Sequence, residues 1–81
     1  MLSIEEYRFC LNIIKKNKKV FNAFDVISLF DIYFDKITFY TIISNDLNNF
    51  SSDLGIINIT KNFSFIVSSS NEYSFIWKFI D

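Results

Sequence analysis

The sequence predicts an α+β domain in which three helices are followed by a two- or three-stranded antiparallel β-sheet. Apolar residues recur at helical spacing through the first two thirds of the chain, and after residue 62 they alternate with other residues, as in strands. Gly55, the only glycine, stands between these regions as a natural helix end or turn. Because no linker or repeat divides the chain, residues 1–81 are expected to form a single domain.

The first helix is predicted to begin after Ser3 and to end among the lysines of residues 15–19. Ser3 and Glu6 have the spacing of a capping box, in which each side chain accepts a hydrogen bond from the other's backbone N–H. One apolar stripe at helical spacing contains Ile4, Tyr7, Cys10, Leu11 and Ile14. Phe9 and Ile13 fall outside this stripe, so the helix is expected to bury two faces.

The second helix is predicted after Asn22, which is a favourable N-cap, with Asp25 in the first turn. Its apolar residues leave almost no polar face, which predicts a largely buried helix: Val26, Ile27, Leu29, Phe30 and Phe34.

The third helix is predicted to begin at Asp35 or Thr38 and to end at Gly55. Its core stripe is expected to contain Phe39, Tyr40, Ile43, Leu47, Phe50 and Leu54. The opposite, polar side carries Thr38, Thr41, Asn45, Asn48, Asn49 and Ser52.

The remainder reads as strands, with a short one at residues 56–60 and two longer ones after it. Two sets alternate with their neighbours at period two, namely Phe63, Phe65 and Val67, and Tyr73, Phe75, Trp77 and Phe79. Turns are expected at residues 61–62 and 69–71.

This order of elements resembles the winged helix-turn-helix superfamily over nearly the whole chain. The resembling segments are "NAFDVISLF" as second helix and "ITFYTIISNDLNNFSSDLGIINI" as third helix, turn and first wing strand. The second segment carries a Leu-x-x-Phe run before Leu-Gly-Ile-Ile, which is common in bacterial and phage winged-helix regulators. The resemblance implies a winged-helix-like fold and, as many members do, DNA binding through residues 37–52.

The composition argues against an enzyme and against cofactors. The absence of His excludes Ser-His and Cys-His nucleophile pairs, and a single Gly excludes phosphate-cradling loops. Asp31 and Asp35, four residues apart, could bind a hard cation or serve as a solvated face or helix cap. Cys10, alone in the chain and within a core stripe, is expected to act as a small apolar residue. We therefore expect a protein that is not an enzyme, needs no cofactor or metal, and takes no small-molecule substrate.

Residue choice indicates the source and compartment rather than the activity. Phe, Ile, Asn, Lys and Tyr, all encoded by A/T-rich codons, make up 45 of the 81 residues. An A/T-rich gene is typical of a phage, a virus, another mobile element or an A/T-rich host. No apolar run approaches the length of a membrane span, and the acidic start "MLSIEEY" is unlike a signal peptide. A cytoplasmic location, in the host cell for a viral protein, is expected.

The first functional hypothesis is a regulator or inhibitor that acts by binding a protein, with homodimerisation as its simplest form. It rests on the net charge of −1 and on apolar positions that the predicted elements leave outside the core. The predicted interface anchors are Phe9, Ile13, Ile66, Ile76 and Ile80, with Asp46 and Asp53 as an acidic rim.

The alternative is a transcriptional regulator that reads A/T-rich DNA. Asn can bind adenine and the Thr methyl can contact thymine, so the predicted reading residues are Thr38, Thr41, Asn45, Asn48 and Asn49. Charge would come from Lys36 and Lys61 and from the "KKNKK" lysines, Lys15, Lys16, Lys18 and Lys19, which equally suit the end of the first helix. Lysines clustered beside the third helix would favour DNA, and lysines on the far side would favour a protein.

Overall fold

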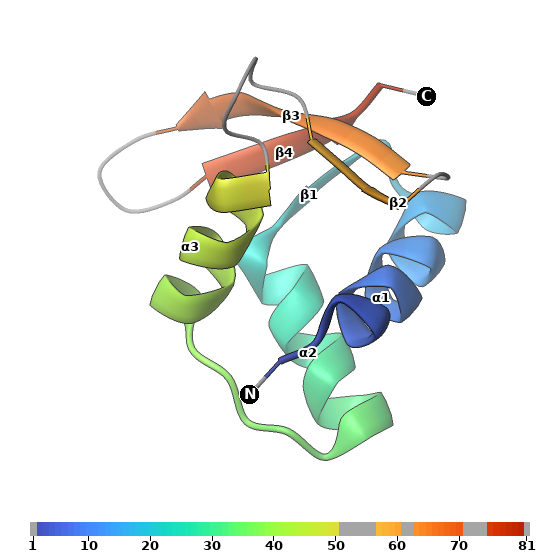
Figure 1. Cartoon of the computed structure of the whole chain (residues 1–81), viewed down its shortest axis with the longest axis vertical. Helices are drawn as coiled ribbons and strands as arrows, with labels where there is room; N and C mark the ends of the chain where they lie inside the picture. Colours follow the sequence, from blue (N-terminus) through green and yellow to red (C-terminus); the bar gives the residue numbers. More distant parts are fainter. Residues whose placement is uncertain (1, 51–56, 61–62, 71–74, 81) are drawn as a thin grey trace.

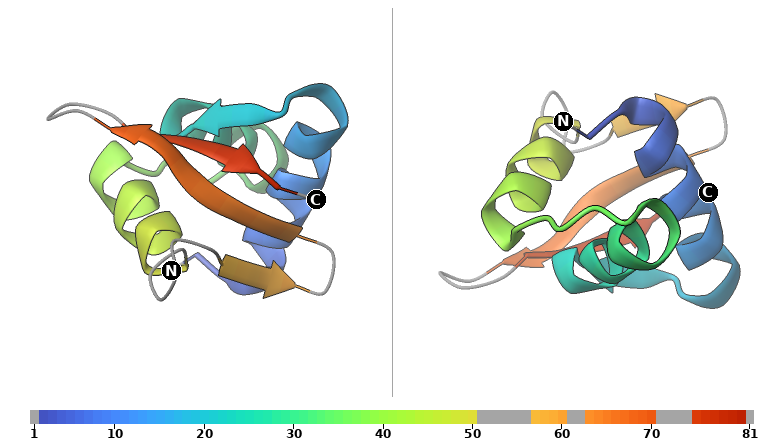
Figure 2. Two further views of the ribbon diagram at one scale, coloured as in Figure 1. Left: turned by 90° about the horizontal axis from the view of Figure 1, so that it is seen from above. Right: turned by 90° about the horizontal axis from the view of Figure 1, so that it is seen from below.

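Three helices cover one face of a four-stranded antiparallel sheet (Figures 1 and 2). The computed structural model describes residues 2–50, 57–60, 63–70 and 75–80. Along the chain the elements are α1 (Ile4–Asn17), β1 (Val20–Asn22), α2 (Ala23–Phe34), α3 (Tyr40–Phe50), β2 (Ile57–Thr60), β3 (Phe63–Ser70) and β4 (Phe75–Phe79). The predicted α+β class is confirmed, and so are the three helices and the antiparallel pairing of the C-terminal strands.

The predicted strand count was wrong, because β1 lies between the first two helices. Its three residues pair with β4, Val20 opposite Lys78 and Asn22 opposite Ile76, and the strand order is β1-β4-β3-β2. So short a strand has too few residues to show alternation, and its partner lies more than fifty residues away in the sequence. Through this pairing, β1 connects the N-terminal helices to the last strand of the sheet.

Local sequence signals fix the start of α1 as predicted. Glu6 N–H donates to Ser3 Oγ at 3.1 Å, and Ser3 N–H donates to Glu6 Oε1 at 2.9 Å. Lys36 from the α2–α3 connection also forms an ion pair with Glu6. This lysine and the capping box lower the pKa of the Glu6 carboxyl.

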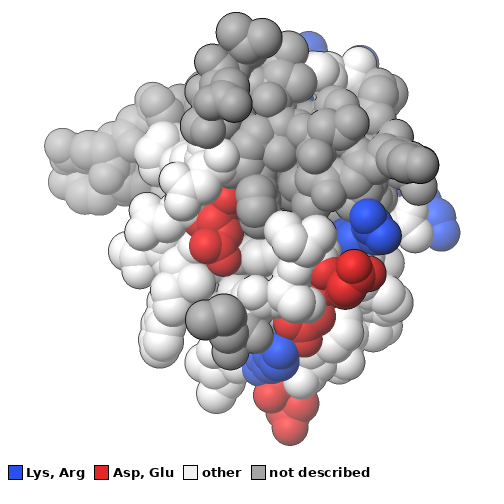
Figure 3. All heavy atoms as spheres, in the orientation of Figure 1, with Lys and Arg blue, Asp and Glu red and all other residues white. Residues whose placement is uncertain are grey.

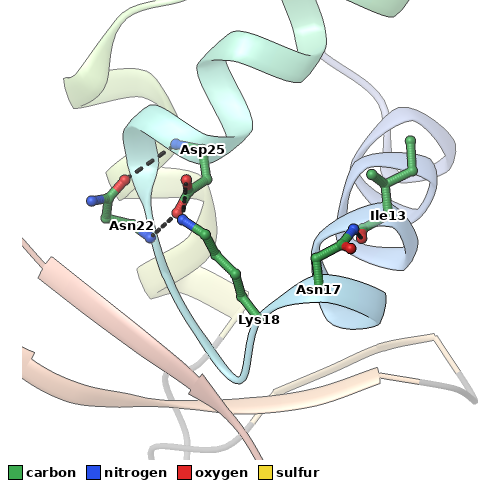
Figure 4. A network of polar contacts seen from close by, with 5 residues as sticks. All are labelled: Ile13, Asn17, Lys18, Asn22 and Asp25. Carbon is green, nitrogen blue, oxygen red and sulfur yellow. Dashed lines mark hydrogen bonds and ion pairs between the residues drawn. The ribbon is translucent and has the colours of Figure 1, made fainter.

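The junction of α1, β1 and α2 is held by a second capping box (Figure 4). Asp25 N–H donates to Asn22 Oδ1 at 3.1 Å, and Asn22 N–H donates to Asp25 Oδ2 at 3.0 Å. Lys18 Nζ lies 2.9 Å from Asp25 Oδ1, so one lysine of the "KKNKK" group ties α1 to α2. The N-cap predicted at Asn22 is confirmed.

The start predicted for α3 was wrong by two residues or more, because residues 35–39 are not helical. Asp35 has a left-handed backbone, with φ of 51°, which turns the chain out of α2. Because the helix begins later, the predicted burial of two side chains was wrong. Phe39, predicted in the core, is exposed, and Thr38, predicted on the polar face, is buried. The predicted helix end at Gly55 lies outside the described residues.

The core lies between the sheet and the helices. It contains Tyr7, Cys10, Leu11, Ile14, Phe21, Ala23, Val26, Phe30, Ile43, Leu47, Trp77 and Phe79. The alternation predicted for β4 is confirmed, since Trp77 and Phe79 are buried whereas Ile76, Lys78 and Ile80 are exposed. Ile4 was predicted in the core stripe but is exposed, because it is the first residue of α1.

Candidate protein-binding surface

Several highly exposed apolar side chains lie at the C-terminal end of α2 and just after it. Ile32, Tyr33 and Ile37 expose 69%, 53% and 83% of their surface. Phe9 of α1 is also exposed, and its ring meets the ring of Tyr33 edge-on with 5.2 Å between centroids. We call the surface formed by Phe9, Asp31, Ile32, Tyr33, Asp35 and Ile37 the α2 tip.

The α2 tip carries two acidic residues where a helix favours basic ones. Asp31 is in the last turn of α2 and Asp35 is its C-cap, and the last turn contains no basic residue. Both carboxylates therefore lie near the negative end of the helix dipole, and at four-residue spacing they repel each other. Asp35 also holds the left-handed conformation, which is unfavourable for a residue with a side chain. Such departures from local preference gather at functional sites.

The apolar part of the tip contacts the core through tilted and edge-on rings. The Phe9 ring lies 5.3 Å from the Phe34 ring, and the Phe34 ring lies 5.8 Å from that of the fully buried Phe30. The Phe30 ring in turn meets that of Tyr7 at 5.2 Å. This chain of contacts holds Phe9 and Tyr33 in place, so a partner would order few side chains there.

An apolar groove continues from the tip toward α3. Its volume is about 500 Å³, and it is lined by Leu2, Ile37, Thr38, Ile42 and Asp46. Asp46 accepts a hydrogen bond from the Tyr7 hydroxyl, and burial together with this carboxylate raises the pKa of Tyr7. On this face of the molecule the described surface over α3 carries few charges (Figure 3).

The predicted interface anchors do not form one surface. Phe9 belongs to the α2 tip, whereas Ile13 lies half-buried in a hollow between α1 and α2. Ile76 and Ile80 lie on the face of the sheet opposite the helices, because Trp77 and Phe79 between them point into the core. Ile66 pairs with Lys78 through the backbone of β3. Of the predicted acidic rim, Asp46 lies in the groove and Asp53 falls outside the described residues.

The predicted DNA-reading set is also divided. Thr38 is only 8% exposed, and Asn48 Oδ1 accepts a hydrogen bond of 3.1 Å from Trp77 Nε1. Both side chains are therefore engaged with the interior of the protein. Lys36 is paired with Glu6. The exposed members are Thr41, Asn45 and Asn49, spaced four residues apart along α3. Lys61 lies outside the described residues.

The "KKNKK" lysines, residues 15–19, lie at the C-terminal end of α1, on the side away from α3 (Figure 1). Lys15 and Lys19 line a hollow beside Phe79, and the Lys15 Nζ lies 5.9 Å from the centre of that ring. Lys78 is on the adjacent exposed face of β4, opposite Val20. We call the surface of Lys15, Lys16, Lys19, Val20, Lys78 and Ile80 the lysine corner.

Ile32, Tyr33 and Ile37 were not among the interface residues predicted from the sequence. One signal was available: a helix that buries Val26 and Phe30 cannot also bury every member of the run Ile32-Tyr33-Phe34 on the same face. Ile37 gave no such signal, because the residues around it were assigned to a helix.

Cys10 is fully buried in the core. Burial raises the pKa of the Cys10 thiol to about 12, with a smaller effect of Glu6, so this sulfur is a poor nucleophile at neutral pH. Among the described residues, no group of three or more Cys, Asp or Glu side chains is arranged to hold a metal ion. No helix within the described ranges has both the length and the apolar character needed to cross a membrane.

No protein-family model matches this chain, and comparisons with curated proteins and with solved structures gave no match either.

Proposed function

We propose that this chain is a winged-helix-like module without enzymatic activity that acts as a regulator or inhibitor by binding a protein through the α2 tip. The proposed relation to winged helices is supported by the connectivity. Three helices and a C-terminal antiparallel sheet, the elements on which the resemblance rests, are present, and β1 pairs with β4 at the edge of the same sheet.

The observation that carries the proposed function is the composition of the α2 tip. Ile32, Tyr33 and Ile37 are exposed beside two acidic groups that the helix end itself disfavours. Burying one such apolar side chain is worth about 1.5–3 kcal/mol, so a partner would gain much from covering this surface. A partner with basic groups would also relieve the repulsion between Asp31 and Asp35.

The distribution of charge favours a protein over DNA. DNA binding relies on cations that position the reading element against phosphates. Here the lysine corner lies away from α3, and Lys36, at the start of the connection to α3, is paired with Glu6.

The test is affinity capture from the source cell with the wild type and two variants, read by mass spectrometry. Ile32→Ser with Ile37→Ser removes apolar surface from the tip, and Ile76→Ser is the matched control on the outer face of the sheet. We expect the tip variant to lose the proteins that the wild type and the control retain, while all three give the same circular dichroism. Equal retention by the tip variant would refute the proposed function.

The alternative, reading of A/T-rich DNA, draws on the exposed row of Thr41, Asn45 and Asn49. It predicts a mobility shift on A/T-rich duplex that weakens steeply with salt and disappears in Thr41→Ala with Asn45→Ala. Alanine favours helix, so loss of the shift in that variant would not reflect loss of α3. Absence of a shift at low salt would eliminate this alternative.

A further inference from the structure

Among the described residues, the charges that form no ion pair are separated into an acidic end and a basic end. Glu5, Glu6 and Asp25 are each paired with a basic side chain, Arg8, Lys36 and Lys18 respectively. Within the described residues, Asp31 and Asp35 at the α2 tip form no ion pair, and neither do Lys16, Lys19 and Lys78 at the lysine corner. The charges left over are therefore of one sign at each end.

Exposed apolar residues accompany the charges at both ends. At the α2 tip these are Ile32, Tyr33 and Ile37. At the lysine corner, Val20 and Ile80 are exposed, and Val20 lies directly across from Lys78 in the sheet. Each end thus has the composition of a protein contact surface, an apolar centre with a charged margin.

The two ends lie apart in the molecule. In Figure 1 the sheet with β4 is at the top and the C-terminal end of α2 is at the bottom, on opposite sides of the helical layer. The molecule measures 32 × 30 × 22 Å along its principal axes. A two-fold dimer through the tip would bring Asp31 and Asp35 of both copies together, which repulsion disfavours.

We propose that the α2 tip binds the lysine corner of a second copy of this chain, so that copies associate head to tail. This inference rests on the proposed function, since it names the partner of the α2 tip. Lys19 and Lys78 would face Asp31 and Asp35, and Val20 and Ile80 would cover Ile32 and Tyr33. Because a head-to-tail pair still has one unused tip and one unused corner, association continues until a ring closes or a short filament forms.

Head-to-tail contact predicts a specific dependence on concentration and salt. The mean mass should rise steadily with concentration rather than stop at a dimer, unless a ring closes. The charged groups are exposed, so association should weaken between 0.1 M and 1 M salt as the screening length falls from about 10 Å to about 3 Å.

The test uses two variants that each destroy one end. The tip variant is Asp31→Asn, Ile32→Ser and Asp35→Asn, and the corner variant is Lys19→Glu with Lys78→Glu. We expect each alone to associate at least tenfold more weakly than the wild type by sedimentation equilibrium. Mixed in equal amounts, they should form a 1:1 dimer and nothing larger, because the mixture contains one intact contact.

The controls separate this inference from the proposed function. Phe24→Ser, at an exposed apolar residue of α2 outside both surfaces, should associate as the wild type does, and circular dichroism should show that all variants fold. A wild type that stays monomeric at millimolar concentration at low salt would overturn the inference, as would variants that fail to pair when mixed or a fixed dimer that neither variant disrupts. If the inference fails in this way but the tip substitutions still abolish capture of another protein, the proposed function stands.

Discussion

The acidic end of α2 should lower the stability of the free chain, and removing its charge should raise it. Asp35→Asn is the informative change, because Asn has nearly the same shape and accepts the left-handed backbone, with φ of 51°, that Asp35 adopts. The substitution therefore removes the charge and leaves the turn between α2 and α3 intact.

The magnitude follows from two local interactions. A charge that opposes the helix dipole costs about 0.3–1 kcal/mol. A like-charged pair at four-residue spacing, here with Asp31, costs about 0.2–0.5 kcal/mol. Asp35→Asn should thus stabilise the chain by about 1 kcal/mol, which raises the melting temperature of a domain of this size by about 4–8 °C.

The assay is urea unfolding followed by the fluorescence of Trp77, the single tryptophan, which is fully buried. Asp25→Asn is the matched control, the same chemical change at the opposite end of the same helix. There the carboxylate completes a capping box and pairs with Lys18, so its loss should destabilise by about 0.5–2 kcal/mol. A lower midpoint for Asp35→Asn would show that the charge stabilises the free chain and would contradict an unfavourable charge at the α2 tip.

Three further predictions concern the interior and pH. Asn48→Leu leaves the indole N–H of Trp77 without the acceptor it has now, which should destabilise by about 1–3 kcal/mol in the same urea assay; an unchanged midpoint would contradict the bond's importance. The pKa of Glu6 is lowered, chiefly by Lys36, so its stabilising effect is present above its unfolded pKa of about 4.5 and is lost as pH falls through the folded value. Urea midpoints should therefore drop below pH 4.5, and less so in Glu6→Gln; equal pH profiles would disprove this. Cys10 is fully buried, so the native chain should react with a thiol reagent only after unfolding, and rapid labelling of native protein would contradict the packing.

The sequence predicts most where the signal is local. Ser3 with Glu6, and Asn22 with Asp25, set the starts of α1 and α2 through hydrogen bonds between residues three apart, which spacing alone reveals. The alternation around Trp77 likewise depends only on the strand's own geometry.

The sequence predicts least where a distant contact or an unusual backbone conformation determines the local structure. β1 becomes a strand because β4 pairs with it, and nothing within residues 20–22 requires that. Asp35 ends α2 in a conformation that glycine usually takes, so the chain leaves the helix where the apolar spacing suggested that a new one begins. That single turn moves Thr38 inward and Phe39 outward, and it leaves Ile37 exposed at the tip. Because the turn at Asp35 is not evident from the sequence, the residues of the α2 tip could not be grouped into one surface from the sequence alone.

The most direct test of the α2 tip as a protein contact is photo-crosslinking in the source cell. A photoreactive phenylalanine derivative at position 32 should give a crosslinked protein band, whereas the same group in place of the exposed Phe24, at the start of α2 and outside both surfaces, should give none. A band of another mass identifies a foreign partner, and a band at a multiple of the chain's own mass identifies a second copy. Crosslinking at position 24 with none at position 32 would contradict the assignment of the tip as the binding surface.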